Sequence, residues 1–364
     1  MTQETTAVKP ETTPALSLTN RFFSLVPGVL LLFVVGYAGK LAEQAFKDYG
    51  KANNLTLPNV EYVLWAIIFG LVIANTVGLP RIFHPGVATY EYFLKVGIVL
   101  LGARFVLGDV LKLGGVSLAL VIIELFVAIG IMVVLGRAFK LKPKLTSLLA
   151  LGSSICGVSA IIAGKGAIEA DDDDAAFAIA AILALGVFGL FAYPAVGHAF
   201  NMSDQAFGVW VGLAVDNTAE ASAAGAIYSE AAGKVAVLTK TTRNAMIGFV
   251  VLGFALYWAS RGQAKAITNK KTFLWQKFPK FVLGFLFISL LATLGIFNAS
   301  QLTSLGNLSR WAFMFTFAGV GLRTDFREMR KQGLRPFVVG AIAELTVTVV
   351  TFLMVLGASA LFNL

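Results

Sequence analysis

Four polar residues capable of ion chemistry interrupt an otherwise apolar stretch, "GLAVDNTAEASAAGAIY" at 212–228. They are Asp216, Asn217, Thr218 and Glu220. On a helix, Asp216 and Glu220 are four residues apart and share one face. Two carboxylates on one face repel each other unless a proton or a cation lies between them. The spacing therefore predicts a site for a coupling ion, H⁺ or Na⁺, and a structural ion pair with a neighbouring helix is the alternative.

Two basic residues follow in "KTTRNAM" at 240–246, where Lys240 and Arg243 are about one helical turn apart. The planar guanidinium of arginine suits bidentate recognition of tetrahedral oxyanions, and lysine supplies a compact point charge. The pair could therefore bind an anionic substrate, or it could neutralise the two acids. The sequence leaves both roles open.

A third segment, "ALGSSICGVSAIIAG" at 150–164, is rich in small and hydroxyl-bearing residues. Glycines weaken a helix, and serine hydroxyls can replace lost backbone partners, so an unwound segment that lines a cavity is expected. Close helix packing by small residues is the alternative. The candidate ligands here are Gly152, Ser153, Ser154, Gly157 and Ser159.

The composition places these segments in an integral membrane protein. Of 364 residues, 57% are hydrophobic and only 13% are charged, whereas soluble domains carry roughly 25% charged residues. The mean hydropathy is +0.80. A single cysteine, Cys156, excludes an intramolecular disulfide framework. With only His84 and His198 as histidines, we expect no multi-histidine metal centre and no cofactor.

Two further function classes are disfavoured by the sequence. The net charge of +9 does not indicate nucleic-acid binding, because the basic residues are divided among short loops that flank apolar segments. Enzyme motifs of the HExxH, GxSxG and P-loop types are absent from the sequence, so the chain is expected not to be an enzyme. A membrane-embedded enzyme that uses Asp216 and Glu220 as an acid/base pair remains a remote alternative.

The predicted fold is an all-α polytopic membrane protein with about eleven transmembrane helices, broken near the midplane. Residues 1–22 are polar and predict a disordered N-terminal tail, and residues 23–364 predict a single transmembrane domain. The expected spans, each long enough to approach roughly 30 Å of hydrocarbon, are 25–42, 61–78, 87–107, 115–137, 145–164, 175–197, 206–228, 235–258, 280–297, 307–323 and 336–361.

The distribution of Lys and Arg predicts the orientation. If the N-terminus is cytoplasmic, eighteen basic residues lie on that side and seven on the other. This bias predicts the N-terminus inside and the C-terminus outside, with an odd number of crossings. On this count "DDDD" at 171–174 lies on the outer side, where it complements the positive end of the following helix.

An inverted repeat is expected between about 87–137 and 307–361. "LLGARFVLGDVLKLGG" at 100–115 parallels "GVGLRTDFREMRKQGL" at 319–334, and with a one-residue gap Glu124 pairs with Glu344. The two copies lie seven expected spans apart, so they run in opposite directions. Inverted repeats around a midplane site are common in secondary transporters.

The segment "GSSICGVSAI" resembles the YeiH-type membrane proteins, a family labelled as sulfate exporters and placed near the bile acid, arsenite and riboflavin transporter superfamily. The resemblance extends through "LGARF", "AFAIAAILALGVFGLFAYP", "FGVWVGLAVDNTAEASAAG", "KTTRNAM" and "FAGVGLRTDF", and so covers most of the chain. Many relatives carry a histidine and a different acidic pattern where this chain has Val215 to Thr218. The residues that the resemblance marks as functional are therefore Ser153, Ser154, Gly157, Ser159, Lys240 and Arg243.

Together these features predict a secondary active transporter that exports a small inorganic or organic anion, such as sulfate, sulfite or a sulfonate, coupled to H⁺ or Na⁺. In this hypothesis Asp216 and Glu220 carry the coupling ion. No metal site is expected, except that Na⁺ at these two acids is left open as the coupling ion. An importer of an organic anion and a cation/proton exchanger are alternatives on the same scaffold. The expected partners are the anion, the coupling ion and membrane lipid. The expected location is a bacterial inner membrane, and a homodimer is left open.

Overall fold

The chain folds into helices joined by short connections, as a computed structural model describes for residues 18–53, 62–105, 107–325, 327 and 334–362. The described residues contain no β-strand, so the all-α class is confirmed. The helices are α1 (Leu18–Ala52), α2 (Tyr62–Thr76), α3 (His84–Val87), α4 (Tyr90–Leu101), η1 (Gly102–Arg104), α5 (Leu107–Ala138), α6 (Pro143–Ser154), α7 (Val158–Ile168), α8 (Asp172–Ala199), α9 (Asp204–Ala214), α10 (Thr218–Tyr228), α11 (Glu230–Ala245), α12 (Ile247–Ser260), α13 (Lys270–Lys277), α14 (Lys280–Thr293), α15 (Ala299–Arg323) and α17 (Leu334–Phe362).

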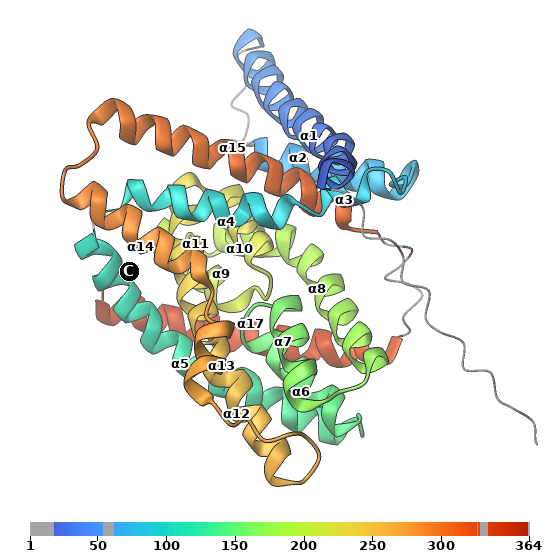
Figure 1. Cartoon of the computed structure of the whole chain (residues 1–364). Helices are drawn as coiled ribbons and strands as arrows, with labels where there is room; N and C mark the ends of the chain where they lie inside the picture. The colour runs from blue at the N-terminus through green and yellow to red at the C-terminus, as the bar shows by residue number, and fades with distance from the viewer. Residues whose placement is uncertain (1–17, 54–61, 106, 326, 328–333, 363–364) are drawn as a thin grey trace, which may run out of the picture.

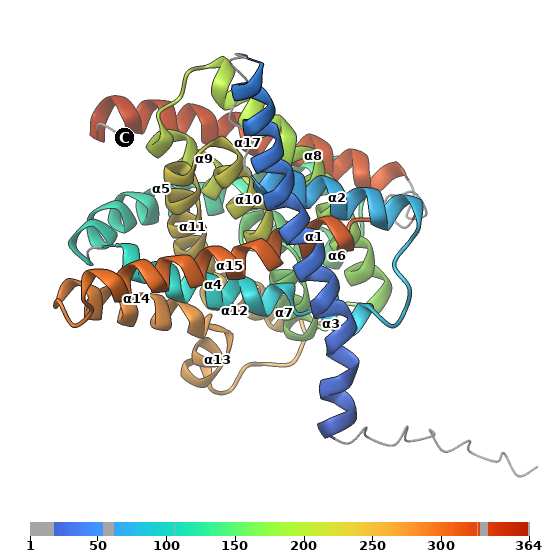
Figure 2. The same cartoon turned by 90° about the horizontal axis from the view of Figure 1, so that it is seen from above.

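One group of helices forms a scaffold layer made of α1, α2, α3, α4, α14 and α15. Helix α15 packs against α2, α4 and α1, and α14 packs against α4 (Figures 1 and 2). Glycines allow the closest of these approaches. A Cβ on Gly70 of α2 would lie 2.7 Å from the backbone nitrogen of Leu322 on α15, so only glycine fits this crossing.

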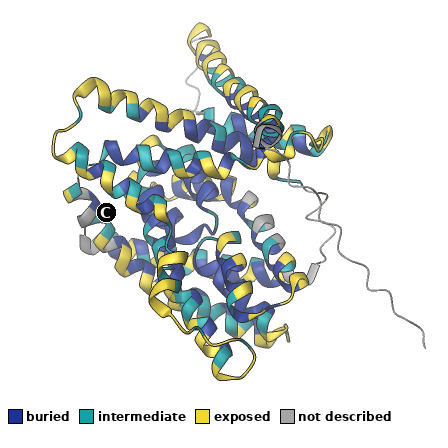
Figure 3. Ribbon diagram, viewed as in Figure 1, coloured by how far each residue is buried: buried dark blue, intermediate teal, exposed yellow. Residues whose placement is uncertain are grey.

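A second layer, made of α5 to α12 with α17, carries the polar segments. Helix α5 contacts α6, α11 and α17, and α11 packs along both α9 and α10. The hydrophobic core of this layer includes Trp210, Phe207 and Leu213 of α9, which are completely or almost completely buried. In Figure 3 the dark, buried residues gather in the middle of the molecule, and exposed residues follow the outer faces of the helices.

The outer faces are strongly apolar. Phe126 on α5 is 76% exposed and Val77 after α2 is 81% exposed. Apolar side chains at such exposure are expected where hydrocarbon replaces water as the solvent. Five of the described helical segments are long and apolar enough to cross a bilayer, or six if the bent pair α13 and α14, at 67°, counts as one span. Each of the eleven expected spans coincides with a described helix or with consecutive described helices.

Two of the expected spans turn back on themselves. Helices α6 and α7, which cover 145–164, form an antiparallel hairpin: the side chains of Leu148 and Leu151 on α6 lie beside Gly164 on α7. The outer ends of the hairpin meet, because Lys144 donates to the backbone carbonyl of Glu169 at 2.7 Å. The tip of this hairpin, residues 155–157, points into the molecule.

Helices α9 and α10, which cover 206–228, form a second hairpin. The hydroxyl of Ser229 donates to Asp204 at 2.7 Å, and the hydroxyl of Tyr228 donates to the carbonyl of Met202 at 2.5 Å. Phe207 and Tyr228 stack with ring centroids 3.9 Å apart, so the start of α9 lies beside the end of α10. The expectation of a single crossing is therefore wrong for both segments. Periodicity and length do not distinguish a broken span from a helical hairpin.

The first hairpin also corrects the placement of the acidic run at 171–174. Asp174 accepts a hydrogen bond from Lys142 at 3.0 Å, and this contact raises the pKa of Lys142. The acidic run therefore lies on the same side as the basic loop at 137–144, not on the opposite side. Lys165 moves to that side as well, which strengthens the basic bias there. Removing two crossings keeps their number odd, so the expected orientation of the termini is unchanged.

Two expectations concern residues at the margins of the described chain. Residues 1–17 of the expected N-terminal tail lie outside the described residues, and residues 18–22 form the first turn of α1. The expected inverted repeat relates α4 and α5 to α15 and α17, and it stays a prediction. Its matched acids, Glu124 on α5 and Glu344 on α17, both approach the centre of the second layer.

The hairpin topology predicts the sidedness of four positions. Single cysteines at Lys144, Glu169, Asp204 and Ser229, in a chain with Cys156→Ser, are treated with a membrane-impermeant thiol reagent in vesicles. The first two should react from one side of the membrane, and the last two from the other side. Labelling of Lys144→Cys and Glu169→Cys from opposite sides would restore the crossing topology for 145–164.

Candidate functional site

The tips of the two hairpins meet in the interior of the second layer. The first tip, residues 155–157, turns at Gly157, whose φ of 63° lies in the region that favours glycine. A Cβ on Gly157 would lie 3.9 Å from the backbone carbonyl of Asp216 in the second tip, so the tips are in contact. Because each tip ends one helix and begins another, four helix ends converge here.

Lys240 on α11 joins the two tips. Its side chain is fully buried, and its Nζ donates to the carbonyl of Ile155 and to the carbonyl of Val215, both at 2.6 Å. Ile155 follows the last residue of α6, and Val215 follows the last residue of α9. One ammonium group therefore satisfies carbonyls at the C-terminal ends of two different helices.

Arg243, one turn further along α11, also donates hydrogen bonds to backbone carbonyls of both hairpins, and it has more donor groups than Lys240. Its Nε donates to the carbonyl of Ser154 at 2.8 Å, and its Nη2 donates to that of Ser153. Its Nη1 donates to the carbonyls of Leu213 at 2.6 Å and Val215 at 3.1 Å. The planar guanidinium thus spans both hairpins, with geometry that a lysine at this position could not reproduce.

Lys240 and Arg243 contact only one kind of helix end at the tips, the C-terminal end. The C-terminal ends of α6 and α9, which carry partial negative charge, face the two buried cations. The N-terminal ends of α7 and α10 carry partial positive charge, and neither Lys240 nor Arg243 donates to them. Oriented N-terminal ends are well suited to bind an anion.

The N-terminal ends of α7 and α10 line a cavity of about 350 Å³. From the first hairpin the lining includes Cys156, Val158 and Ser159. From the second hairpin it includes Asn217, Thr218 and Ala219. Asn217 caps α10 by accepting from the backbone N–H of Ala219 at 2.9 Å. The volume falls within the range of roughly 300–1,000 Å³ that is usual for ligand pockets.

The opposite wall of the cavity comes from the scaffold layer and from the junction of α13 and α14. It contributes Glu91 and Lys95 of α4, together with Lys277 and Lys280. Three basic residues and one acidic residue therefore line the cavity together with the two helix N-termini, although the ammonium group of Lys280 donates to the carbonyls of Trp275 and Phe278. The charges give the cavity a net positive character.

Behind the tips, four carboxyl groups surround the two buried cations. Asp216 lies 3.4 Å from Nη2 of Arg243, and Glu124 of α5 lies 3.0 Å from the same nitrogen. Glu344 of α17 is hydrogen-bonded to Asp216 and accepts from Tyr193 at 3.0 Å. A hydrogen bond between two carboxyl groups requires a proton on one of them, because ionised carboxylates only accept.

Glu220 is the fourth carboxyl group of this buried cluster. Its Oε1 accepts from Asn217 at 3.4 Å, and its Oε2 has no hydrogen-bond partner among the described residues. It packs directly against Gly186 of α8, where any larger side chain would overlap it. Four carboxyl groups thus face two basic groups, Lys240 and Arg243. The cluster is electrically neutral only when two of the carboxyl groups carry protons.

The sequence-predicted site residues separate into two groups in the structure. Ser159, Asn217 and Thr218 line the cavity. The others lie at or behind the tips: Gly152, Ser153, Ser154, Gly157, Asp216, Glu220, Lys240 and Arg243. Of the two roles left open for Lys240 and Arg243, their contacts favour neutralisation, because their donors point to carbonyls and carboxylates. Gly152 packs against Ile161 and Ile182 and so serves the packing of the hairpin.

The sequence prediction missed the second carboxyl pair and the far wall of the cavity. Glu124 and Glu344 were visible as matched acids of the repeat, and an acid within a span is a candidate site by itself. Lys277 and Lys280 carry no such signal, because basic residues near span ends are ordinary. Lys95 lies inside the expected span 87–107, but its i, i+4 spacing from Glu91 predicts a local ion pair instead of a binding site. Within the described residues, no cluster of three or more His, Cys, Asp or Glu side chains is arranged to hold a metal ion. Na⁺ at Asp216 and Glu220 stays a prediction.

The chain belongs to the family described as conserved hypothetical protein 698, which matches residues 27–340. This confirms the resemblance to the YeiH-type membrane proteins. A UPF0324 membrane protein from Nitratidesulfovibrio vulgaris is 34% identical over 319 residues, covering 86% of this chain and 88% of its own length. One from Clostridium tetani is 33% identical, covering 80% and 87%, and one from Streptococcus agalactiae serotype V is 29% identical, covering 92% and 97%. No solved structure matches the chain.

The buried cations should be essential for the meeting of the tips. Arg243→Gln removes donors to four carbonyls and leaves Glu124 unpaired, so we expect a loss of about 3–5 kcal/mol in the free energy of unfolding. Denaturant unfolding of the detergent-solubilised protein measures it. Adding Glu124→Gln should recover part of the loss, because the unpaired carboxylate is then removed.

A matched control is available on the same helix. Lys234 of α11 is partly exposed, and among the described residues its one ion pair is with Glu230, at 3.1 Å, so Lys234→Gln should change the free energy of unfolding by less than about 1 kcal/mol. Equal, small effects of Arg243→Gln and Lys234→Gln would contradict the role of Arg243 as the connection between the hairpins.

Proposed function

We propose that this membrane protein is a secondary active transporter that moves a small anion, such as sulfate, sulfite or a sulfonate, across a bacterial inner membrane. The observation that carries the proposal is the charge arrangement at the hairpin tips. Lys240 and Arg243 neutralise the C-terminal helix ends, and the N-terminal ends of α7 and α10 remain directed at the cavity. An anion is the ligand that this arrangement favours.

In this proposal the anion lies between the two layers. Backbone N–H groups at the starts of α7 and α10, with Ser159, Asn217 and Thr218, hold its oxygens from one side. Lys95, Lys277 and Lys280 contribute positive charge from the other side, and the negative charge of Glu91 lowers the net positive charge there. Tetrahedral oxyanions accept several hydrogen bonds at once, which suits a site with donors on opposite walls.

Coupling is assigned to the carboxyl groups behind the tips. The hydrogen bond between Asp216 and Glu344, and the excess of carboxyl groups over basic groups, support protons as the coupling ion. Gain or loss of a proton changes the charge directly beside Arg243, on which the contact between the tips depends. Asp216 and Glu220 are the sequence-predicted carriers, and Glu344 joins them.

The arrangement of the hairpins supports alternating access. The hairpin of α6 and α7 enters from the side of the basic loop at 137–144, and the hairpin of α9 and α10 enters from the other side. The cavity lies where this layer faces α4 and the start of α14. A shift of the hairpin layer along the scaffold layer would expose the anion to one side or the other.

The cavity also has room for a small organic anion, so an importer or exporter of such an anion is the second candidate. An enzyme is disfavoured, because Asp216 and Glu220 are buried and neither of them is among the residues that line the cavity. The relatives, which are named as membrane proteins, are consistent with transport and carry no enzyme name.

Anion transport is tested with purified protein in proteoliposomes that contain labelled sulfate or a sulfonate. The double variant Lys95→Gln/Lys277→Gln removes two positive charges from the cavity wall, so the apparent affinity for the anion should fall by about tenfold, which corresponds to roughly 1.4 kcal/mol. The double variant Lys265→Gln/Lys270→Gln removes the same charge at two exposed positions outside the cavity lining, so it is the charge-matched control and should transport normally. Equal affinities in all three proteins would contradict the proposed site.

Coupling is tested with imposed proton and sodium gradients in the same vesicles. Asp216→Asn keeps the size of the side chain but cannot carry a proton, so uptake should continue while its dependence on the proton gradient is lost. Asp173→Asn, an exposed acid at the start of α8, should retain the dependence. Unchanged coupling in Asp216→Asn would remove its proposed role. Cation exchange in the absence of any anion would favour the exchanger instead.

A further inference from the structure

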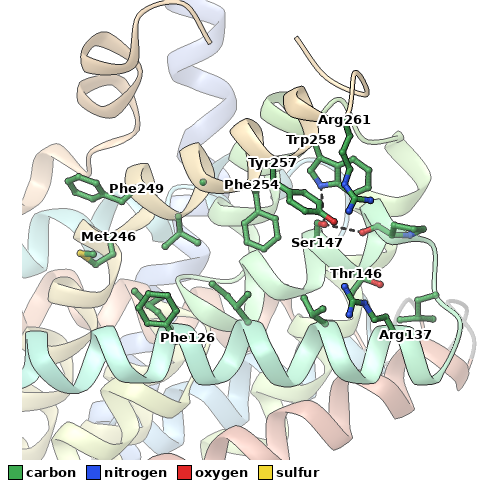
Figure 4. A pocket seen from close by; sticks show the side chains of 18 of the residues that line it. Phe126, Arg137, Thr146, Ser147, Met246, Phe249, Phe254, Tyr257, Trp258 and Arg261 are labelled. Atoms are coloured by element: carbon green, nitrogen blue, oxygen red, sulfur yellow. Dashed lines mark hydrogen bonds between the residues drawn. The ribbon is translucent and has the colours of Figure 1, made fainter. Parts of the chain in front are cut away.

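A second and larger cavity, of about 670 Å³, lies on the outside of the hairpin layer. It runs between α5 and α12, and residues at the start of α6 close it on the third side (Figure 4). Its residues do not overlap with those that line the anion cavity. At the start of α12, Met246 lines this groove while Ile247 lines the anion cavity, so the helix separates the two.

Most of the groove is apolar and open to the surroundings. Phe126 of α5 and Phe249 and Phe254 of α12 extend into it in Figure 4, from the end opposite the arginines toward its middle. Phe126 is 76% exposed and Phe249 is 57% exposed. Between two spans of a membrane protein, an open apolar groove of this kind is filled by hydrocarbon chains.

The other end of the groove is polar and basic. Arg137 in the last turn of α5 and Arg261 directly after α12 both lie there, as Figure 4 shows. Both residues are exposed, and among the described residues neither guanidinium forms an ion pair. Arg261 lies over the ring of Tyr257, with 4.6 Å between the guanidinium carbon and the ring centroid. The basic end therefore presents two guanidinium groups that have no acidic partner among the described residues.

This basic end lies at the depth of lipid headgroups. It belongs to the basic side of the protein, with the loop at 137–144 and the connection after α12. Trp258 beside it donates to Ser147 at 3.1 Å, and Tyr257 is partly exposed. Tryptophan and tyrosine at the ends of spans are typical of the interface between hydrocarbon and headgroups.

We propose that this groove is a binding site for one anionic phospholipid, with its phosphate at Arg137 and Arg261 and an acyl chain along Phe126 and Phe249. A second copy of the chain fits the groove less well. In a two-fold dimer with its axis along the membrane normal, the same ends of the groove meet, and the arginines of both copies converge. Like charges brought together in this way oppose association. A lipid phosphate complements them instead.

Binding is measured as the rise in melting temperature of the delipidated, detergent-solubilised protein on titration with phosphatidylglycerol or phosphatidylcholine. The wild-type protein should be stabilised by phosphatidylglycerol at concentrations where phosphatidylcholine has little effect. The double variant Arg137→Gln/Arg261→Gln should bind phosphatidylglycerol about 30-fold more weakly, if each arginine near the surface contributes roughly 1 kcal/mol. The double variant Arg81→Gln/Lys271→Gln removes the same charge outside the groove and should bind normally.

A second pair of variants tests the apolar part of the groove. Gly253 of α12 lines the groove, and a Cβ there would meet no other atom within 4 Å, so Gly253→Trp starts from an open position and places an indole in the groove. Gly357 of α17 is equally open and lies outside the groove, so Gly357→Trp is the matched control. Native mass spectrometry should show retained phosphatidylglycerol on the wild type and on Gly357→Trp, and much less on Gly253→Trp.

Three results would overturn the proposal. The first is equal stabilisation of the wild type by both lipids. The second is unchanged phosphatidylglycerol binding by the arginine double variant and by Gly253→Trp. The third is a dimeric wild-type protein that Gly253→Trp converts to a monomer without loss of lipid. Because the readouts are binding and mass, they do not depend on whether the chain transports an anion.

Discussion

The structure depends on one interaction, the donation of hydrogen bonds from two buried cations to the carbonyls of two helix ends. Hairpins that enter from opposite sides bring the negative ends of α6 and α9 close together, far from water. Burying each of these carbonyls without a hydrogen-bond partner would cost free energy, and the dipoles of the two helix ends would repel each other. Lys240 and Arg243 supply donors and positive charge at the same place, and they connect Ile155 and Val215 across the gap.

The same interaction explains why the site contains so many acids. A buried cation needs compensation, and Glu124 and Asp216 provide it at 3.0 and 3.4 Å from Arg243. Glu220 and Glu344 exceed what two cations can balance, so protons complete the neutralisation. A cluster whose neutrality depends on bound protons, beside a contact that holds the hairpins together, links proton binding to the conformation of the tips.

Lys240 and Arg243 neutralise the C-terminal ends of α6 and α9, so the N-terminal ends of α7 and α10 remain available to bind a ligand. The anion cavity and the lipid groove then lie on opposite sides of the start of α12, one facing the scaffold layer and one facing the membrane. Both are concave sites with basic groups, yet their chemistry differs. The cavity has backbone donors and convergent polar side chains, whereas the groove has aromatic walls and charge only at the headgroup end.

The sequence by itself determined the class, the positions of the apolar segments and the polar stretches at 150–164, 212–228 and 240–246. It did so because the composition and hydropathy of a segment depend only on its own residues, and they decide whether that segment is stable in hydrocarbon. The tertiary structure decided whether 145–164 and 206–228 cross or turn back, and which atoms Arg243 contacts. Those carbonyls lie 28 to 90 residues away along the chain, and Glu344 comes from the last helix. Contacts at such separations follow from packing, which no local pattern encodes.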